Sequence, residues 1–402
     1  MLDAYLYDGL RTPIGRHAGK LATLRPDDLA GEVIKEVVGR NKIDPAEISD
    51  VVLGCVTQAG EDCRNVARFA ALLAGLPPTT PGVTVNRLCA SGLQAVVDAA
   101  RAVTCGEGEL FIAGGVESMT RAPYVMAKSD SPYSRDVKMY DTTIGSRFPN
   151  PRFTRQYGDD SMPQTGDNVA KEFGITRAQA DEFALASQQK YAKAEAEGFY
   201  QGEILPVALP AKKKDAPPVM VDADEHPRRD STMESLAKLK PLFEGGVVTA
   251  GNASGVNDGA AALLIANRAW GDKTGRKPIA RILAAASAGV EPRIMGVGPA
   301  YAIPKALERA KLTLKDLDII EINEAFASQM LGCLKLMNVE FDDPRVNPNG
   351  GAIAIGHPLG CSGARLALTV ARQLQRSGTR YAAVSLCIGV GQGLAVILER
   401  LP

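Results

Sequence analysis

One histidine, His357, lies in the most unusual backbone of the chain. Five glycines fall between residues 350 and 363 around it, and the whole chain has only three histidines. Glycine permits a tight turn or a close approach to another group, so we expect His357 to be held at a turn that faces a site. Histidine is the usual proton carrier near neutral pH. The segment therefore predicts a general acid or base.

Cys89 lies where a predicted strand gives way to a predicted helix, in the stretch VNRLCASG at residues 85–92. A helix N-terminus offers unpaired N–H groups and partial positive charge. Both favour a thiolate, and the N–H groups can also hold a developing oxyanion. The alternative is a buried cysteine that packs as a small apolar residue. Position alone leaves the two interpretations evenly balanced.

Two further candidates end predicted strands. Cys387 runs into residues 388–393, where three glycines leave N–H groups free to point at a ligand. An ordinary glycine turn is the alternative. Asn323 follows the predicted strand at 319–322, and its amide can orient a water or donate to an oxyanion. Capping of the helix that follows is the alternative role for Asn323.

Together these residues give two thiols, one imidazole and one amide at strand ends, which is where sites gather in α/β proteins. A thiol with a histidine predicts acyl transfer through a covalent intermediate. A second thiol adds a separate acid or base, which simple hydrolysis does not require. The set fits the making or breaking of a carbon–carbon bond beside a thioester.

The elements that would position these residues occur in the same order twice. In the first third, strands are expected at 4–7, 51–54 and 110–113, with helices at 26–40, 65–74 and 93–103. The last third has strands at 319–322 and 382–386 around a helix at 364–374. A Ser-Gly pair opens the third helix of the first part and the helix of the second. We therefore predict two similar α/β halves packed together.

The middle of the chain has a different character. Residues 129–165 are polar and proline-rich, Thr176 and Gln179 form a capping box for a helix, and residues 208–231 read as an exposed loop. We expect this segment to be an insertion that covers one face of the first half. Its basic clusters, Lys212–Lys214 and Arg228-Arg229, fit a solvated loop or a phosphate contact equally well.

Composition sets the broad class. The chain has 402 residues, 45% of them hydrophobic, and its 46 basic residues balance 46 acidic ones. That balance argues against nucleic acid or an anionic membrane as partner. No signal peptide, membrane span or metal-binding pattern is visible. Seven scattered cysteines are an odd number, typical of reduced thiols in the cytoplasm.

Six motifs in a specific order resemble the thiolase family over essentially the whole length. They are the segments around Cys89, Asn323, His357 and Cys387, with GGVESM at 114–119 and AGNASGVNDG at 250–259. The resemblance implies a layered αβαβα sandwich of two similar halves with an inserted loop domain. The halves would be residues 1–120 with 247–272, and residues 273–402, and the loop domain over the active site would be residues 121–246. Family members are usually homodimers or homotetramers.

The resemblance also implies roles. Cys89 would take the acyl group after activation by His357, and Cys387 would carry the proton at the α-carbon of acetyl-CoA. Asn323, through a water, and His357 would stabilise the thioester enolate. The N–H groups of Cys89 and Gly389 would form a second oxyanion hole. Coenzyme A and acyl-CoA would be substrates, with no permanently bound cofactor or metal. Ser254 and Arg228 would contact coenzyme A, and Met162 and Met295 would form pocket walls near the acyl–pantetheine junction.

Three stretches, at 58–68, 141–148 and 160–163, are most similar to 3-oxoadipyl-CoA thiolases of aromatic degradation. Cys63 and Ser146 depart from them, because those enzymes tend to have asparagine and tryptophan there. Ser161 replaces a histidine found in many acetoacetyl-CoA thiolases. A substrate that ends in a carboxylate needs a cation in reach. The candidates are Arg64, Arg68 and Arg147, for each of which surface solvation is the alternative.

Other functions remain open at this point. An acetoacetyl-CoA thiolase or a general 3-ketoacyl-CoA thiolase of β-oxidation would use the same residues. A Cys–His hydrolase or a decarboxylating condensing enzyme would release free acid or need a malonyl thioester, and Cys387 argues against both. An inactive relative that binds acyl-CoA or lipid should lack a site residue, and none is missing.

Overall fold

The computed structural model describes residues 1–211 and 217–401. Its main element is a ten-stranded mixed sheet in the order β4-β3-β5-β10-β1-β11-β14-β13-β12, with β2 paired to β10. The strands are β1 (Ala4–Arg11), β2 (Gly15–Arg16), β3 (Ile48–Gly54), β4 (Gly82–Val85), β5 (Leu110–Ser118), β10 (Asn257–Ala266), β11 (Ala280–Gly289), β12 (Ile319–Ile322), β13 (Tyr381–Ile388) and β14 (Gln392–Glu399).

The two ends of this sheet repeat one unit. The first half has the order β4-β3-β5-β10-β1, and the second has β12-β13-β14-β11. A parallel bridge from Val346 to Ile320 stands where β4 stands in the first half. The halves join at one edge, where residues 4–6 of β1 pair with residues 280–282 of β11. The predicted duplication and the α/β class are confirmed.

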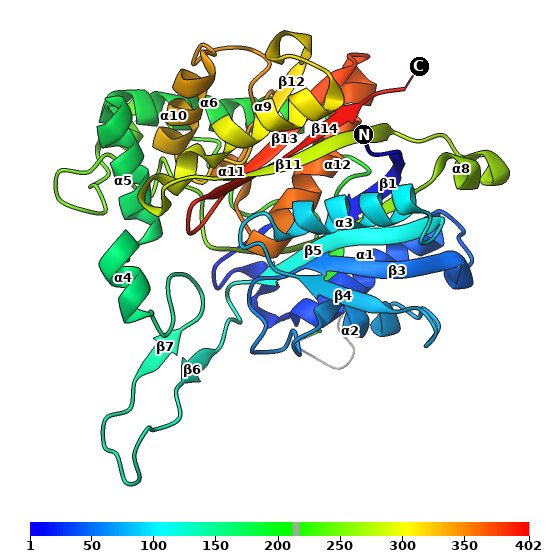
Figure 1. The fold of residues 1–402 in the computed structure, drawn as a ribbon, viewed down its shortest axis with the longest axis horizontal. Coiled ribbons are helices and arrows are strands. Elements are labelled where there is room, and N and C mark those ends of the chain that lie inside the picture. Colours follow the sequence, from blue (N-terminus) through cyan, green and yellow to red (C-terminus); the bar gives the residue numbers. More distant parts are fainter. Residues whose placement is uncertain (212–216, 402) are drawn as a thin grey trace.

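Helices complete the layers, as Figure 1 shows. α3 (Ser91–Cys105) and α12 (Leu359–Ser377) pack on each other between the two parts of the sheet. α1 (Pro26–Arg40) and α2 (Val66–Leu73) cover the outer face of the first half. α9 (Gly298–Ala310) and α10 (Ala327–Met337) cover that of the second. The result is the layered sandwich that the family resemblance implied.

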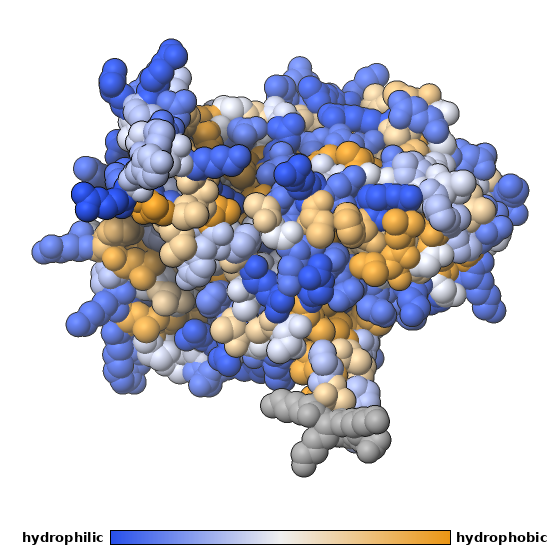
Figure 2. Space-filling model, turned by 90° about the horizontal axis from the view of Figure 1, so that it is seen from below, coloured by the Kyte–Doolittle hydropathy of each residue, from blue (hydrophilic) through white to orange (hydrophobic). Residues whose placement is uncertain are grey.

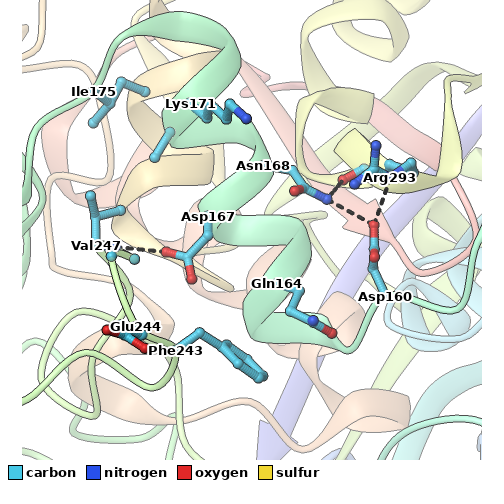
Figure 3. Close-up of a pocket in the computed structure, with 13 residues that line it drawn as sticks. Asp160, Gln164, Asp167, Asn168, Lys171, Ile175, Phe243, Glu244, Val247 and Arg293 are labelled. Carbon is cyan, nitrogen blue, oxygen red and sulfur yellow. Dashed lines mark hydrogen bonds and ion pairs between the residues drawn. The ribbon is translucent and has the colours of Figure 1, made fainter.

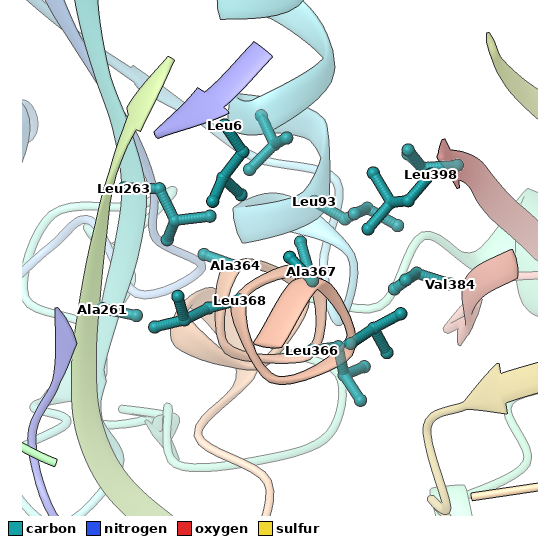
Figure 4. Close-up of a cluster of buried hydrophobic side chains, with 14 of the residues drawn as sticks. Leu6, Leu93, Ala261, Leu263, Ala364, Leu366, Ala367, Leu368, Val384 and Leu398 are labelled. Carbon is teal, nitrogen blue, oxygen red and sulfur yellow. The ribbon is translucent and has the colours of Figure 1, made fainter. Parts of the chain in front are cut away.

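The central layer holds the core that joins the halves. Leu366 and Leu368 of α12 lie with Leu93 of α3, Leu263 of β10 and Val384 of β13 in one buried cluster (Figure 4). Each fully buried aliphatic side chain of this kind stabilises the fold by about 1.5–3 kcal/mol. Because side chains of α12 pack against strands of both halves in this cluster, the two halves are packed as one body.

The middle segment differs from the prediction. It carries α4 (Pro151–Tyr157), α5 (Met162–Phe173), α6 (Arg177–Ala196), α7 (Met233–Ala237) and the hairpins β6 (Tyr124–Met126)–β7 (Met139–Asp141) and β8 (Val207–Leu209)–β9 (Val219–Val221). α5 and α6 pack on α10, in the second half, whereas Val207 of β8 and Val221 of β9 lie in the buried cluster of the first half, so the insertion covers parts of both halves and not the first alone. The β6–β7 hairpin projects away from the body (Figure 1). The boundaries at 120 and 246 stay a proposal.

Residues 208–231 are also not simply an exposed loop. Besides β9, they contain Asp224, which is buried and accepts a hydrogen bond of 2.6 Å from Nη1 of the buried Arg11. Nε of Arg11 donates to Glu203 at 2.7 Å. A buried arginine requires such partners, and they come from some two hundred positions away. Among the described residues, every helix is too short or too polar to span a bilayer.

Candidate active site

The N-termini of α3 and α12 meet at one point. A Cβ on Gly92 would lie 2.5 Å from the carbonyl oxygen of Gly360, and a Cβ on Gly363 would lie 2.2 Å from the nitrogen of Leu93. These clashes explain the glycine of each Ser-Gly pair. Ser91-Gly92 opens α3 as predicted, whereas α12 begins three residues before Ser362-Gly363, at Leu359. Cys89 precedes Gly92 by three residues and His357 precedes Gly360 by three. The nucleophile and the base predicted from sequence therefore enter from the same end of the central layer.

A strained turn presents Cys89. Leu88 has φ +45°, in the left-handed region that a leucine rarely adopts. The turn is held by Ser91, whose Oγ accepts from the nitrogen of Arg87 at 2.9 Å and donates to the oxygen of Leu88 at 2.7 Å. Asn86 accepts from the nitrogen of Leu88 at 2.9 Å. Strain retained at such a position is typical of a functional site.

The Cys89 thiol keeps its proton. Burial raises its pKa above the ordinary value, although the N–H of Gly389 donates to the sulfur and acts in the opposite direction. The backbone N–H groups do favour the thiolate, as expected, but desolvation of the charged sulfur outweighs them. Reaction of Cys89 therefore requires a base. This contact places Gly389 beside the reacting sulfur, and its role in an oxyanion hole stays a prediction.

The surroundings of His357 favour a neutral imidazole with a free lone pair. Its Nδ1 lies 2.6 Å from Oγ of Ser362, and that hydroxyl donates its proton to the oxygen of Pro358 at 2.8 Å. Nδ1 must therefore carry the hydrogen, which leaves Nε2 as the free lone pair. Nε2 is buried and has no hydrogen-bond partner among the described residues. Burial, assisted by Arg365, lowers the pKa of His357 to about 3.

The backbone around His357 is fixed by the side chain of Asn257. The nitrogen of His357 donates to Oδ1 of Asn257 at 2.9 Å. Gly356 has φ +107°, and a Cβ there would lie 2.6 Å from the same amide. The predicted turn is confirmed at this glycine, but a short helix, α11 (Ala352–Ile355), precedes it and was not foreseen.

Cys387 lies at the end of β13 and is fully buried. Burial raises its pKa well above the ordinary value, and the nearby Cys89 raises it further. The two sulfurs are thus close enough for the charge on one to act on the other. A link across the two loops supports this, because Arg87 donates to Oε1 of Gln392 at 3.1 Å. Cys387 holds a proton that it can deliver.

Asn323 follows β12, and its backbone nitrogen donates to Ser385 of β13 at 2.9 Å. Both polar atoms of its side chain are buried without a hydrogen-bond partner among the described residues. The helix-capping alternative was wrong, because α10 begins four residues later with Phe326 as its N-cap. The amide is available to a water or a substrate oxygen.

The two predicted pocket methionines lie beside Cys387. Met295 and Phe326 form a buried cluster with Cys387, and Met162 packs against that cluster. Sδ of Met162 would be 3.9 Å from a Cβ on Gly389. The acyl end of a substrate at Cys89 would therefore meet sulfur and aromatic surface.

Of the two predicted coenzyme A contacts, Ser254 lies within residues 250–255 and Arg228 lies beside that segment. The nitrogen of Ser254 donates to the oxygen of Ala325 at 2.9 Å, beside Asn323. Arg228 lines a cavity of about 210 Å³ together with Gly251 and His226. His226, to which no role was given from the sequence, has its pKa lowered to about 4 by burial and by Arg228. Lys212–Lys214 lie outside the described residues.

A larger cavity of about 480 Å³ lies elsewhere, between α5 and residues 243–247 (Figure 3). Its lining includes Asp160, Asp167 and Lys171, and Asp160 accepts from Arg293 at 2.9 Å. None of the predicted site residues lines it. Cavity size alone would therefore mislead the search for the site.

Comparison with known proteins identifies the family of the chain. The model of the thiolase N-terminal domain matches residues 4–269, and that of the thiolase C-terminal domain matches residues 276–400. The chain belongs to the thiolase family. It is an acyltransferase of that family, and the predicted membership is confirmed.

Relatives of this thiolase cover its full length. A "Beta-ketoadipyl-CoA thiolase" of Acinetobacter baylyi is 55% identical, with 100% of each chain covered. A "3-oxoadipyl-CoA/3-oxo-5,6-dehydrosuberyl-CoA thiolase" of Escherichia coli is also 55% identical at the same coverage. An "Acetyl-CoA acetyltransferase" of Cupriavidus necator is 43% identical, again over both full chains.

Solved structures have the same fold. The acetyl-CoA acetyltransferase of Bacillus anthracis superimposes with a TM-score of 0.92 at 38% identity, covering 100% of this thiolase and 99% of that chain. Human mitochondrial 3-ketoacyl-CoA thiolase gives a TM-score of 0.92 at 37% identity and the same coverage. The layered architecture is therefore that of experimentally determined thiolases.

Proposed function

We propose that this thiolase cleaves 3-oxoadipyl-CoA with coenzyme A to give acetyl-CoA and a shortened, carboxylate-ended acyl-CoA. The observation that carries the substrate is the 55% full-length identity to proteins named for it, against 43% to an acetyl-CoA acetyltransferase. The chemistry rests on the neutral thiol, the neutral imidazole and the second protonated thiol described above. Acetoacetyl-CoA is the alternative substrate that the same groups could cleave.

In the first half-reaction, Sγ of Cys89 attacks the 3-keto carbon, and its proton passes to the free Nε2 of His357. The C2–C3 bond breaks, and its electron pair forms the enolate of acetyl-CoA. Cys387 gives its proton to C2 of that enolate, and acetyl-CoA leaves. The unpartnered amide of Asn323 supports a role in binding the enolate oxygen, where one donor is worth roughly 3–4 kcal/mol of barrier.

In the second half-reaction, the thiol of free coenzyme A attacks the acyl group on Cys89. The N–H groups of Cys89 and Gly389 would hold the oxyanion, which the Gly389–Cys89 contact supports. The Cys387 thiolate takes the proton of the coenzyme A thiol, and Cys89 leaves as a thiolate that recovers its proton from His357. Arg228 and Ser254 would contact coenzyme A, since Arg228 lines an open cavity beside residues 250–255. Run backwards, the sequence is a Claisen condensation.

The distal carboxylate of the substrate needs a cation. The three candidate arginines differ in their exposure and in the hydrogen bonds that they already make. Arg68 is occupied, because its guanidinium donates to the carbonyl oxygens of Thr80 and Pro78. Arg64 is exposed, and Arg147 donates only to the oxygen of Gly145 at 3.3 Å. We therefore propose Arg64 and Arg147 for contact with the carboxylate.

We also propose that the enzyme is a homo-oligomer of the cytoplasm. β4 forms an edge of the sheet, and Phe69, Leu72 and Leu73 of the neighbouring α2 are 44–51% exposed. An apolar edge of this kind favours association with a second copy of the chain. The β6–β7 hairpin exposes further apolar residues, and Figure 2, viewed from below Figure 1, shows apolar patches among hydrophilic surface. All seven cysteines are free, which suits a reducing compartment.

The substrate test mixes enzyme and coenzyme A with 3-oxoadipyl-CoA or acetoacetyl-CoA and follows the loss of enolate absorbance. We expect a higher kcat/KM for 3-oxoadipyl-CoA, and R64Q or R147Q should lower it for that substrate only. Equal, slow turnover of both substrates would contradict the dicarboxylate assignment. Intact-protein mass after incubation with acetyl-CoA should show an acetyl adduct that is absent in C89S.

A further inference from the structure

Two buried glutamates to which the mechanism gives no role hold the helices on either side of His357. Glu117 lies on β5 and Glu324 directly follows Asn323, and each is 1% exposed. His357 stands between α11, which ends at Ile355, and α12, which begins at Leu359. Neither helix has a side-chain cap from its own N-cap residue or an acid in its first turn. Their N-terminal N–H groups therefore need partners from elsewhere.

Glu117 supplies the partner for α12. Its Oε2 accepts from the nitrogen of Gly360 at 2.9 Å and from that of Val56 at 3.0 Å, while Oε1 accepts from Thr57 at 2.9 Å. Gly360 is pressed against the sheet, since a Cβ there would lie 2.4 Å from the oxygen of Val116. One carboxylate of the first half thus fixes the start of a helix that belongs to the second.

Glu324 supplies the partner for α11. Its Oε2 accepts from the nitrogen of Ile353 at 3.2 Å and from Oγ of Ser187 at 2.6 Å. The same Ser187 hydroxyl accepts from the nitrogen of Gly351 at 3.1 Å. Oε1 of Glu324 accepts from Asn347 at 2.9 Å. A Cβ on Gly351 would lie 2.3 Å from the carboxyl carbon, so the helix start lies directly against this group.

We infer that Glu117 and Glu324 are positioning residues that cap α12 and α11 from outside and thereby hold Nε2 of His357 at the reacting thiol. The inference rests on the proposed function. A carboxylate at a helix N-terminus is stabilised by the helix dipole and satisfies N–H groups. Since both ends of residues 353–360 are anchored, His357 cannot shift without breaking several buried hydrogen bonds. A displacement of about 1 Å at a catalytic group can cost roughly a hundredfold in rate.

The test compares Glu117→Gln and Glu324→Gln with Glu321→Gln. In Glu117 and in Glu324 both carboxyl oxygens accept hydrogen bonds. A glutamine would have to place its NH₂ group, which donates, against another hydrogen-bond donor, so at least one of these bonds would be lost. Glu321 is a buried carboxyl on β12 with no hydrogen bond to residues 353–360, and burial raises its pKa to about 8. It is therefore neutral at pH 7 and its glutamine is a matched control. The rate of Cys89 acetylation by acetyl-CoA is followed by quenched-flow mass spectrometry on each intact variant.

We expect E117Q and E324Q to slow acetylation by about tenfold to a hundredfold, and E321Q to leave it unchanged. The deciding readout is the same substitution in an H357A background. Residues that act through His357 should cause no further loss there, whereas an independent structural role should add its full effect. If E324Q does not fold, Ser187→Ala removes the link to Gly351 and should show the same non-additivity.

Additive losses in the H357A background, or wild-type rates in both glutamine variants, would overturn this inference alone. Wild-type acetylation in H357A itself would overturn the proposed function and this inference together.

Discussion

The two halves of the molecule place different residues at equivalent positions. Glu117 and Cys387 occupy the same place in the repeated unit, opposite Gly259 in β10 and Gly393 in β14. Glu117 accepts three backbone hydrogen bonds, whereas Cys387 lies among apolar side chains. At this one position of the repeated unit, Glu117 anchors backbone N–H groups in the first half. On our proposal, Cys387 transfers a proton in the second half.

The same contrast holds at the end of the adjoining strand. Gly54 pairs with Gly115, and Ile322 pairs with Ser385, which makes Cys55 the counterpart of Asn323. Sγ of Cys55 donates to the oxygen of Thr57 at 3.1 Å, whereas the side chain of Asn323 has no protein partner among the described residues. On the proposed mechanism, the first half therefore provides the nucleophile and a rigid frame, and the second provides the groups that move protons and bind charge.

The largest effect should come from the base. His357→Asn removes the lone pair that accepts the Cys89 proton, and we expect kcat to fall by up to about 10⁴-fold. Steady-state thiolysis of acetoacetyl-CoA at saturating coenzyme A measures this. A fall of less than tenfold would show that another group removes the proton.

The comparison of strand ends predicts the next effect. Asn323→Ala should lower kcat by about 10²–10³-fold, because an oxyanion donor is lost. Cys55→Ala, at the equivalent position, should lower the melting temperature but leave kcat close to wild type. Equal losses of kcat in both variants would refute the division of labour between the halves.

Acid should destabilise the protein through His357. Its pKa is lowered to about 3, so between pH 6.5 and 3 the unfolded chain binds the proton and the folded chain does not. This contribution to the free energy of unfolding is fully present above pH 6.5 and is lost as the pH falls. At pH 5 the free energy of unfolding should be lower by about 2 kcal/mol. Thermal unfolding at pH 7 and pH 5 should show a smaller drop for H357N than for wild type.

A small gain is expected in the first half. Cys63 has φ +52°, a left-handed conformation that asparagine adopts more readily than other non-glycine residues. Cys63→Asn should therefore stabilise the protein by up to about 1 kcal/mol without changing kcat. Differential scanning calorimetry measures the shift, and a lower melting temperature would count against it.

The repeated order of elements could be predicted from the sequence because apolar runs and Ser-Gly pairs mark both halves. Local patterns also pointed to Cys89, Asn323, His357 and Cys387. The protonation of Cys89 could not be predicted, since it depends on burial that outweighs the helix terminus. The partners of Arg11 could not be predicted either, because Glu203 and Asp224 are far away in sequence and their segment is polar.

The central claim is that two sulfurs from different halves act on one substrate, Cys89 as nucleophile and Cys387 at the α-carbon. Cys387→Ala separates the two roles. With acetyl-CoA in D₂O, mass spectrometry of the protein reports acetylation of Cys89, and proton NMR of the thioester methyl group reports exchange. The account predicts full acetylation without methyl exchange in C387A, while wild type shows both. Exchange in C387A at the wild-type rate would contradict it.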